Sequence, residues 1–271
     1  MSRIDGRTPE QFRRVKFTRD YLAHPLSSVL VEFGGTKVLC AISLDPGVPN
    51  WMRSQKIPGG WITCEYGMIP ASTHDRVARE SNRGRPSGRT MEIQRLIGRS
   101  LRSVIDLEAL GANTIYIDCD VIDADGGTRC AGITGASVAL QLAFAESNLA
   151  KRLGKNPMRE NVAAISVGIV DGEPVLDLCY QEDSRAEVDM NVVMTESGKF
   201  VEIQGTAEAQ PFSDQQLQQM LNLARRGLNK IFDLQRRCIT GVTENHGAKP
   251  KGPRPGAQLG SLGDVLGDIK L

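Results

Sequence analysis

The apolar residues of this chain recur with a period of two in some segments and at helical spacing in others. Residues 28–44, SVLVEFGGTKVLCAISL, hold two β-type runs joined by a Gly-Gly turn, which predicts a hairpin. Residues 60–70 predict a further strand, and residues 114–122, TIYIDCDVI, alternate like a half-buried one. Between residues 162 and 210 the pattern is again β, in the runs AAISVGIV, PVLDLCY, DMNVVMT and FVEIQGTAE.

Three other segments show helical spacing. The first begins at about Thr90 and has a stop signal at Gly111. Its apolar face comprises Ile93, Ile97, Leu101 and Val104. The second starts in a glycine-rich segment after residue 122 and should end on the cations Lys151 and Arg152, with Gly154 just past its end. The third starts with a capping box formed by Ser213 and Gln216.

This order of strands and helices predicts an α/β fold of the α+β type, with mixed sheets flanked by helices. A length of 271 residues suits one large domain or two small ones. We expect an N-terminal half at residues 1–154 and an acidic C-terminal half at residues 155–240. Residues 241–271 contain seven glycines and three prolines and should form a flexible tail.

Composition excludes several classes of protein. The apolar runs are shorter than a membrane span, and the N-terminus lacks the apolar segment of a secretory signal. We therefore expect a cytoplasmic protein without membrane association. The six cysteines form no CxxC pair, which indicates reduced thiols, and the three histidines do not share the spacing of zinc ligands.

Charge is segregated along the chain although the net charge is only +1. Residues 1–19 carry six basic residues against two acids, and residues 72–102 carry eight arginines against three acids. Residues 171–208 carry ten acids against two bases. This segregation indicates a polyanion bound on one side and a metal ion on another, or else patches that pair across a subunit contact.

The segment DADGGTRCAGITGASVALQL, residues 123–142, places glycines and an arginine at a strand-to-helix junction. It matches neither the Walker A pattern nor the dinucleotide fingerprint. Backbone N–H groups at a helix start still favour an anion, and Arg129 adds a fork of donors. The predicted donors to a phosphate-sized anion are Gly126, Gly127, Thr128 and Arg129. The alternative is a glycine turn in which Arg129 pairs with Asp123 or Asp125.

Arginines of the first helix form a second candidate. Arg89 lies at the helix start, where a cation is unfavourable unless an anion joins it. Arg95, Arg99 and Arg102 follow as one stripe, which is more typical of a solvated face or of arginines paired with acids.

Carboxylates form the third candidate. Asp177, Asp183 and Asp189 are spaced by six at the edges of β-type runs. Carboxylates that converge from adjacent strands suit magnesium or manganese. Acidic turns are also common, so the spacing alone leaves both interpretations open.

These three segments, GRTMEIQRLIGRSLR, CDVIDADGGTRCAGITGA and EDSRAEVDMNVVMTESG, resemble the ribonuclease PH family, phosphate-dependent exoribonucleases that trim the 3′ ends of tRNA. Further matching runs, including GWITCEYGMIP and VEIQGTAE, occur in the family's order from residue 3 to about residue 240. The chain departs from the family pattern at Cys130 and Gly132, where threonine and serine are usual.

The resemblance implies two βαβα-type halves and a homohexameric ring built as a trimer of dimers. It implies a reversible nucleotidyltransferase in which inorganic phosphate attacks the terminal 3′ phosphodiester and releases a nucleoside diphosphate. The implied phosphate ligands are Arg89, Gly127, Thr128 and Arg129. Asp183 and Asp189 correspond to an acidic pair that binds a divalent cation, expected to be magnesium, or assists the leaving group.

RNA binding should depend on backbone charge, because aromatic residues make up only 5% of the chain. The candidates for holding the tRNA body, from the same or a neighbouring subunit, are Arg76, Arg79, Arg83 and Arg85. The substrates implied are tRNA precursors, with ribosomal RNA 3′ ends as a further possibility. Two rivals are a catalytically silent RNA-binding ring subunit and a nuclease that uses water instead of phosphate.

Overall fold

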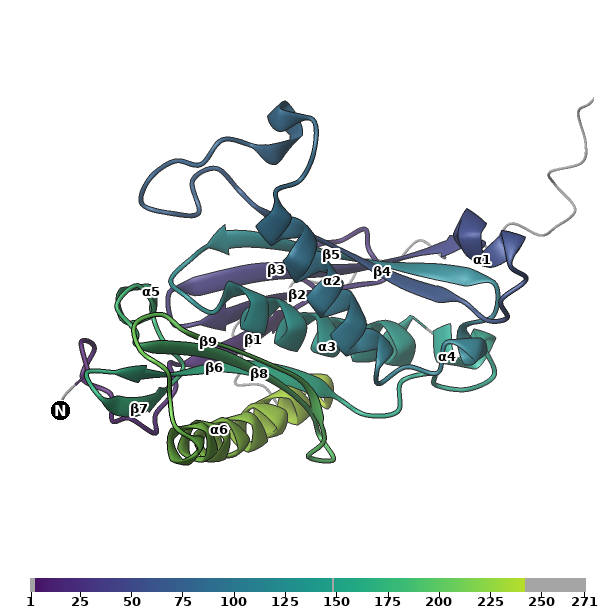
Figure 1. The fold of residues 1–271 in the computed structure, drawn as a ribbon. Helices are drawn as coiled ribbons and strands as arrows, with labels where there is room; N and C mark the ends of the chain where they lie inside the picture. Colours follow the sequence, from purple (N-terminus) through teal and green to yellow (C-terminus); the bar gives the residue numbers. More distant parts are fainter. Residues whose placement is uncertain (1–2, 148, 242–271) are drawn as a thin grey trace, which may run out of the picture.

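The computed structural model describes residues 3–147 and 149–241, and its elements stack as alternating layers of sheet and helix (Figure 1). The first layer is a five-stranded sheet with the strand order β1-β2-β3-β5-β4. Its strands are β1 (Val15–Arg19), β2 (Ser27–Phe33), β3 (Thr36–Pro46), β4 (Trp61–Met68) and β5 (Asn113–Asp123). β4 and β5 run parallel and the other neighbours antiparallel. The predicted β2–β3 hairpin is confirmed.

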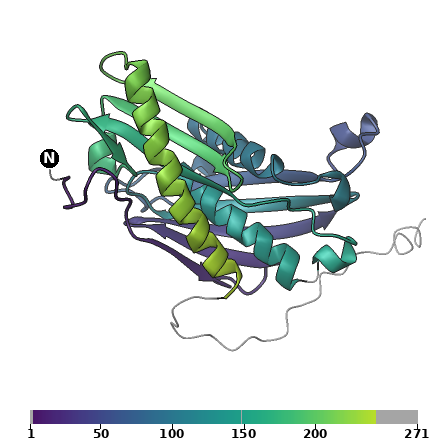
Figure 2. The ribbon, with the colours of Figure 1, turned by 90° about the horizontal axis from the view of Figure 1, so that it is seen from below.

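The second sheet has four antiparallel strands in the order β7-β6-β8-β9. They are β6 (Val162–Val170), β7 (Glu173–Leu176), β8 (Val188–Thr195) and β9 (Phe200–Ala207). Every residue of β6 is buried, because α3 (Thr128–Glu146) contacts it from the layer between the sheets and α6 (Asp214–Ile239) packs against it as well. Figure 2 shows α6 crossing the lower face of this sheet.

The sequence of α3 explains its place between the sheets. It is apolar around its whole circumference, which is typical of a helix buried on all sides. At Gly135 a Cβ atom would lie only 2.5 Å from a side-chain carbon of Val31, so glycine lets the helix approach the first sheet. α2 (Gly88–Arg102) packs beside α3 and against β4.

The predicted helix starts are close to those observed. α2 begins two residues before Thr90, and the capping box of Ser213 and Gln216 begins α6. Shorter elements complete the chain: α1 (Asn50–Ser54), α4 (Leu149–Arg152), α5 (Tyr180–Asp183) and 3-10 turns at Glu80–Arg83 and Glu108–Leu110. Two sheets flanked by helices confirm the predicted α/β class.

Two predicted element ends are wrong, and one predicted helix is interrupted. α2 ends at Arg102 rather than near Gly111, because the chain turns there and Ile105 forms a bridge with Met158. The helix predicted to end on Lys151 and Arg152 does end at Arg152, but it is divided into α3 and α4. The run PVLDLCY is not one strand, since the backbone of Asp177 adopts a left-handed conformation (φ 56°).

Helix length, the cysteines and the C-terminal tail were the other features predicted from composition. Among the described residues, no helix is long and apolar enough to span a bilayer. All six cysteines are free and buried. Of the predicted flexible tail, residues 242–271 lie outside the described part of the chain.

Candidate functional site

The glycine turn between β5 and α3 forms the centre of the site. Gly126 (φ 75°) and Gly127 (φ 67°) are both left-handed. Gly127 is the N-cap of α3 and provides no side chain to cap it, so the N–H groups of the first turn face outward without a side-chain acceptor from that residue. A backbone that opens in this way favours an anion.

The two glycines have different physical roles. A Cβ at Gly126 would lie 2.8 Å from the carbonyl oxygen of Leu178 and 2.9 Å from the backbone nitrogen of Tyr180. The backbone of residues 178–180 therefore packs directly on Gly126. This contact explains why a glycine is required here, without a bound ligand. A Cβ at Gly127 would meet only the Arg13 guanidinium, at 3.2 Å, so of the two glycines Gly127 is the better candidate for phosphate contact.

Thr128, the first residue of α3, is tied to β4. Its Oγ1 lies 2.9 Å from the hydroxyl oxygen of Tyr66, and both side chains are buried. Burial raises the pKa of Tyr66, while the bond to Thr128 and the charges of Arg89 and Arg129 act in the opposite direction. Tyr66 therefore belongs to the site. Sequence reasoning missed Tyr66, because it alternates like any inward-facing strand residue.

Arg129 is held by side chains from two other elements. Its Nη1 donates to Oε1 of Gln204 on β9 at 2.6 Å and lies 3.8 Å from Oε1 of Glu92 on α2. Gln204 in turn donates to Glu92 at 2.6 Å. The alternative pairing of Arg129 with Asp123 or Asp125 is wrong.

Those two aspartates have other partners. Asp123 lies 3.3 Å from Lys37, and Asp125 lies 3.6 Å from Arg13. Arg129 is therefore directed away from them and toward β9 and α2, where its side chain is mostly buried.

Arg89 is the second residue of α2. The hydroxyl of the N-cap residue Ser87 accepts a hydrogen bond from the Thr90 backbone nitrogen at 3.2 Å. The side chain of Arg89 is exposed and forms no hydrogen bond or ion pair with any described residue. A cation in this position is destabilised by the helix dipole, which makes the site favourable for an added anion.

Asp183 and Asp189 lie beside these arginines. Asp183 is the last residue of α5, and Asp189 lies in β8 opposite Gly168 and Thr206. Burial and the negative charge of Asp183 raise the pKa of Asp189 to about 6, while Arg129 and Arg89 oppose the rise. The carboxyl of Asp183 keeps solvent access, but partial burial raises its pKa as well, against the effect of the same two arginines. The structure thus brings all four charged residues of the predicted site together.

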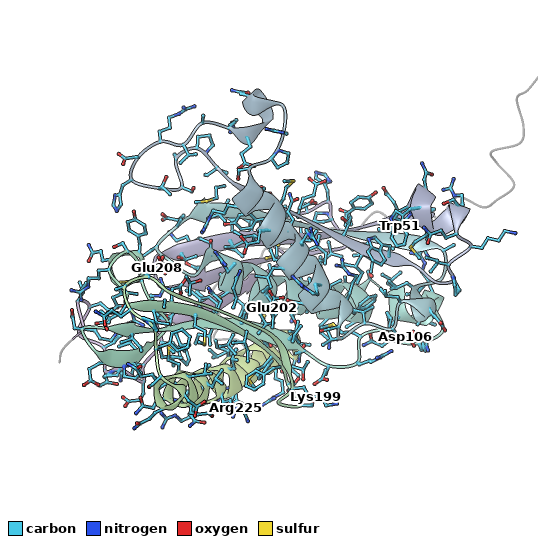
Figure 3. The ribbon with its side chains drawn as sticks, viewed as in Figure 1. Trp51, Asp106, Lys199, Glu202, Glu208 and Arg225 are labelled. Carbon is cyan, nitrogen blue, oxygen red and sulfur yellow. The ribbon has the colours of Figure 1, made fainter. Side chains whose placement is uncertain are left out.

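Glu208 was not singled out in the sequence. Its negative charge helps to raise the pKa of both Asp183 and Asp189. Figure 3 shows Glu208 at the same end of the molecule as α5. Among the described residues, no group of three or more histidines, cysteines or carboxylates is arranged to hold a metal ion. Magnesium commonly uses only one or two protein carboxylates together with substrate phosphates and water. Asp183 and Asp189, which repel each other, fit that donor set.

Asp177 does not join the other two aspartates. It is buried and receives hydrogen bonds from Arg13, so its charge is neutralised within the fold. Arg3 and Arg7 near the N-terminus also pair with acids of residues 171–208. Arg3, Arg7 and Arg13 of the basic N-terminal segment thus pair with acids of the same chain. Neither a bound polyanion nor a subunit contact is needed to explain these three arginines.

The arginine-rich loop joins β4 to α2 and extends away from the body of the molecule (Figure 1). The side chains of Arg76, Arg79 and Arg85 are exposed, and the backbone of Arg83 lies in the 3-10 turn of the loop. The loop starts just after Tyr66 and ends just before Arg89, so its two ends border the candidate site.

The arginine stripe of α2 is partly paired, as its spacing indicated. Arg99 lies 3.1 Å from Glu202, and Arg102 packs over the ring of Trp61 at 4.7 Å. Arg95 is exposed. None of these three is among the main charges that shift the pKa of Asp183 or Asp189.

Family models match most of the chain. Domain 1 of the 3′ exoribonuclease family (RNase PH) matches residues 11–146, and domain 2 matches residues 160–227. The chain belongs to the 3′ exoribonuclease family. The finer assignment to ribonuclease PH itself stays a prediction.

Solved structures share this fold. Rice (Oryza sativa) Rrp46 matches with a TM-score of 0.71 and 20% identity, over 88% of this chain and 100% of that one. A chain of the Archaeoglobus fulgidus exosome with RNA bound to the active site matches with a TM-score of 0.72 and 21% identity, over 86% and 92%. A chain of an archaeal exosome core matches with a TM-score of 0.66 and 21% identity, over 86% of this chain and 91% of that one. At these identities the similarity establishes the fold alone, and it confirms the predicted fold of the family.

Proposed function

We propose that this chain is a phosphorolytic 3′-5′ exoribonuclease that shortens RNA by transferring its terminal nucleotide to inorganic phosphate. The observation that carries the proposal is the convergence of Arg89 and Arg129, at the starts of two helices, with Asp183 and Asp189 around the glycine turn. Two helix starts and two guanidiniums supply the positive field that phosphate requires. The products are a nucleoside diphosphate and a shortened RNA.

The main barrier to this reaction is the repulsion between phosphate and the phosphodiester that it attacks. Arg89, Arg129 and the N–H groups after Gly127 would neutralise the attacking phosphate and orient it toward the last phosphodiester. Magnesium held by Asp183 and Asp189 would supply further charge stabilisation. No histidine base is required, because phosphate already carries an ionised oxygen.

Asp189 offers a second way to assist the leaving group. A carboxyl with a pKa near 6 keeps a proton in an appreciable fraction of molecules close to neutral pH. In the protonated form it would donate that proton to the departing 3′ oxygen. Magnesium would oppose this by lowering the pKa of Asp189, so a pH-rate profile recorded at two magnesium concentrations distinguishes the two roles.

The substrates we propose are the 3′ ends of tRNA precursors and of ribosomal RNA, bound by a homohexameric ring. The resemblance to ribonuclease PH supports tRNA as substrate and the ring, and the RNA-bound exosome structure that shares this fold supports RNA binding. The exposed arginines Arg76, Arg79 and Arg85, together with Arg83, would contact the RNA backbone.

A catalytically silent ring subunit is the second candidate, because the solved structures with this fold include exosome subunits. The four charged site residues favour the enzyme, since a silent subunit need keep none of them.

A product assay decides between these functions. An RNA with a single-stranded 3′ tail is incubated with and without inorganic phosphate, and we expect nucleoside diphosphates only when phosphate is present. Arg129→Ala should reduce their formation by about 10²-fold or more, as expected for losing one preorganised donor. Arg95→Ala, an exposed arginine on α2, is the matched control and should keep full activity.

Other outcomes would contradict the proposal. Monophosphates formed without phosphate would indicate hydrolysis, and RNA binding without any product would indicate the silent subunit. Normal turnover of Arg129→Ala at saturating phosphate would remove Arg129 from the site.

A further inference from the structure

The N-terminal segment contains a buried arginine that the proposed chemistry does not use. Arg13 is only 6% exposed, and it holds the carboxylate of Asp177 from three donors. Its backbone nitrogen and its Nε donate to Oδ2 at 2.7 and 2.9 Å, and its Nη2 donates to Oδ1 at 2.7 Å. A buried ion pair with this geometry neutralises both charges within the fold.

The same guanidinium also reaches the glycine turn. Arg13 Nη1 donates to the carbonyl oxygen of Asp125, and Nη2 lies 3.4 Å from that of Gly126. Thr36 supports the turn from β3, where its hydroxyl donates to the Gly126 carbonyl at 2.6 Å. Gly127 follows at once as the N-cap of α3. The direction of the first N–H groups of α3 therefore depends on these carbonyl contacts.

The other end of this network supports the segment that carries Asp183. Arg3 donates from Nε to Oε1 of Glu182 at 2.8 Å and from Nη2 to the carbonyl oxygen of Asp177 at 2.9 Å. Glu182 also accepts from the backbone nitrogen of Cys179 at 3.1 Å, which closes the turn of α5. Asp183 is the next residue along the chain.

A direct contact joins the glycine turn to this segment. The backbone nitrogen of Tyr180 donates to Oδ1 of Asp125 at 3.2 Å. Together with the backbone of residues 178–180 packed on Gly126, this places the phosphate-binding turn and the carboxylate-bearing turn in one interlocked unit, with Arg13 between them.

We propose that Arg13 is a positioning residue for phosphate: it bridges Asp177 and the carbonyl groups of Asp125 and Gly126, and so aligns the phosphate-binding N–H groups with Asp183. The inference rests on the proposed function, in which the glycine turn binds inorganic phosphate. Arg13 does not touch the phosphate in this assignment, and its effect is transmitted through the turn. The proposal therefore predicts a defect that is specific to phosphate and leaves RNA binding intact.

The chain offers a matched control in Arg7. Arg7 belongs to the same network, and its Nη1 donates to the carbonyl oxygen of Asp177 at 2.9 Å and lies 3.4 Å from Oδ2 of that residue. It has no hydrogen bond to residues 125–127 among the described contacts. Replacement by lysine keeps the charge in both cases, but lysine lacks the planar fork that bridges two acceptors.

The test compares Arg13→Lys with Arg7→Lys in the full chain. We expect Arg13→Lys to raise the KM for phosphate by about 10-fold, with the KM for RNA within about 2-fold of the wild type, because a misplaced turn affects only the attacking anion. Arg7→Lys should lower thermal stability without changing the KM for phosphate. Inorganic phosphate alone should raise the Tm of the wild type and of Arg7→Lys more than that of Arg13→Lys.

Equal phosphate KM values and equal Tm increases for the two lysine variants would overturn the positioning role. If Arg13→Lys does not fold, Asp177→Asn tests the same bridge from its other side, and an unchanged phosphate KM in that variant would also overturn the role. Failure of the proposed function is distinguishable, because the wild type would then show neither phosphate-dependent products nor a phosphate-induced rise in Tm.

Discussion

The substitution Gly126→Ala tests whether this glycine serves the fold or the ligand. Its φ of 75° is a conformation that L residues adopt with difficulty. The added methyl group would also lie within 3.0 Å of three backbone atoms, from Leu178, Cys179 and Tyr180. These atoms cannot move aside like the end of a flexible side chain, so the two halves of the chain would have to separate locally.

The magnitude follows from two contributions. The left-handed backbone costs an alanine about 1 kcal/mol. Overpacking against fixed backbone adds about 1–3 kcal/mol. Gly172→Ala is the matched control, because Gly172 has nearly the same φ, 77°, and a Cβ there would meet no atom within 4 Å. Gly126→Ala should therefore be less stable than Gly172→Ala by about 1–3 kcal/mol, a Tm difference on the order of 5 °C for a chain of this size.

Thermal and urea denaturation of the wild type and the two variants measure this difference. Phosphorolysis should be compared at a temperature where all three are folded. Equal stability of the two variants, combined with a loss of activity in Gly126→Ala alone, would refute the packing argument. That result would show that position 126 lacks a side chain so that phosphate can bind there.

Three further measurements test other parts of the site. The pKa of Asp189, about 6 in the folded protein against 3.8 ordinarily, means that folding favours its protonated form; this contribution to stability is complete below about pH 4 and is lost as the pH rises through 6. Asp189→Asn should therefore match the wild type in urea denaturation near pH 4 and exceed its stability by about 2 kcal/mol at pH 7.5, and a difference independent of pH would contradict the environment described for Asp189. Tyr66→Phe removes the hydrogen bond to the buried Thr128 hydroxyl and should lower the free energy of unfolding by about 1 kcal/mol, whereas unchanged stability would mean that the bond contributes nothing. Replacing the loop residues Arg76, Arg79 and Arg85 together by alanine should reduce the slope of log Kd for RNA against log salt by about 2, measured by fluorescence anisotropy, and a slope equal to that of the wild type would exclude the loop from RNA binding.

Much of the local structure follows from the sequence alone. The hairpin of β2 and β3, the capping box at Ser213 and the start of α2 near Thr90 each depend on residues close together in the chain. Turn geometry, capping and side-chain periodicity are decided by such near neighbours, and for that reason pattern and propensity predict them. The ends of α2 and α3 were less predictable, because they depend on contacts such as the bridge of Ile105 with Met158.

The candidate site also has features that local sequence predicts and features that only the fold decides. Arg89 was identified because a cation at a helix start is a local anomaly, and Arg129 because it adds a fork of donors next to the glycine turn. By spacing and side chain alone, Asp177, Asp183 and Asp189 look equivalent, and only the family resemblance singled out Asp183 and Asp189. The physical cause of their difference is found only in the folded chain.

Asp177 is neutralised by Arg13, which lies 164 residues away in the sequence, whereas Asp183 and Asp189 are left to repel each other beside two arginines. The sequence by itself determined most helices and strands, the fold class and the family resemblance, since these depend on residues within short segments. Only the packing of the two sheets around α3 decided which charges meet, because burial and Coulomb energy depend on distance in space and not on separation along the chain.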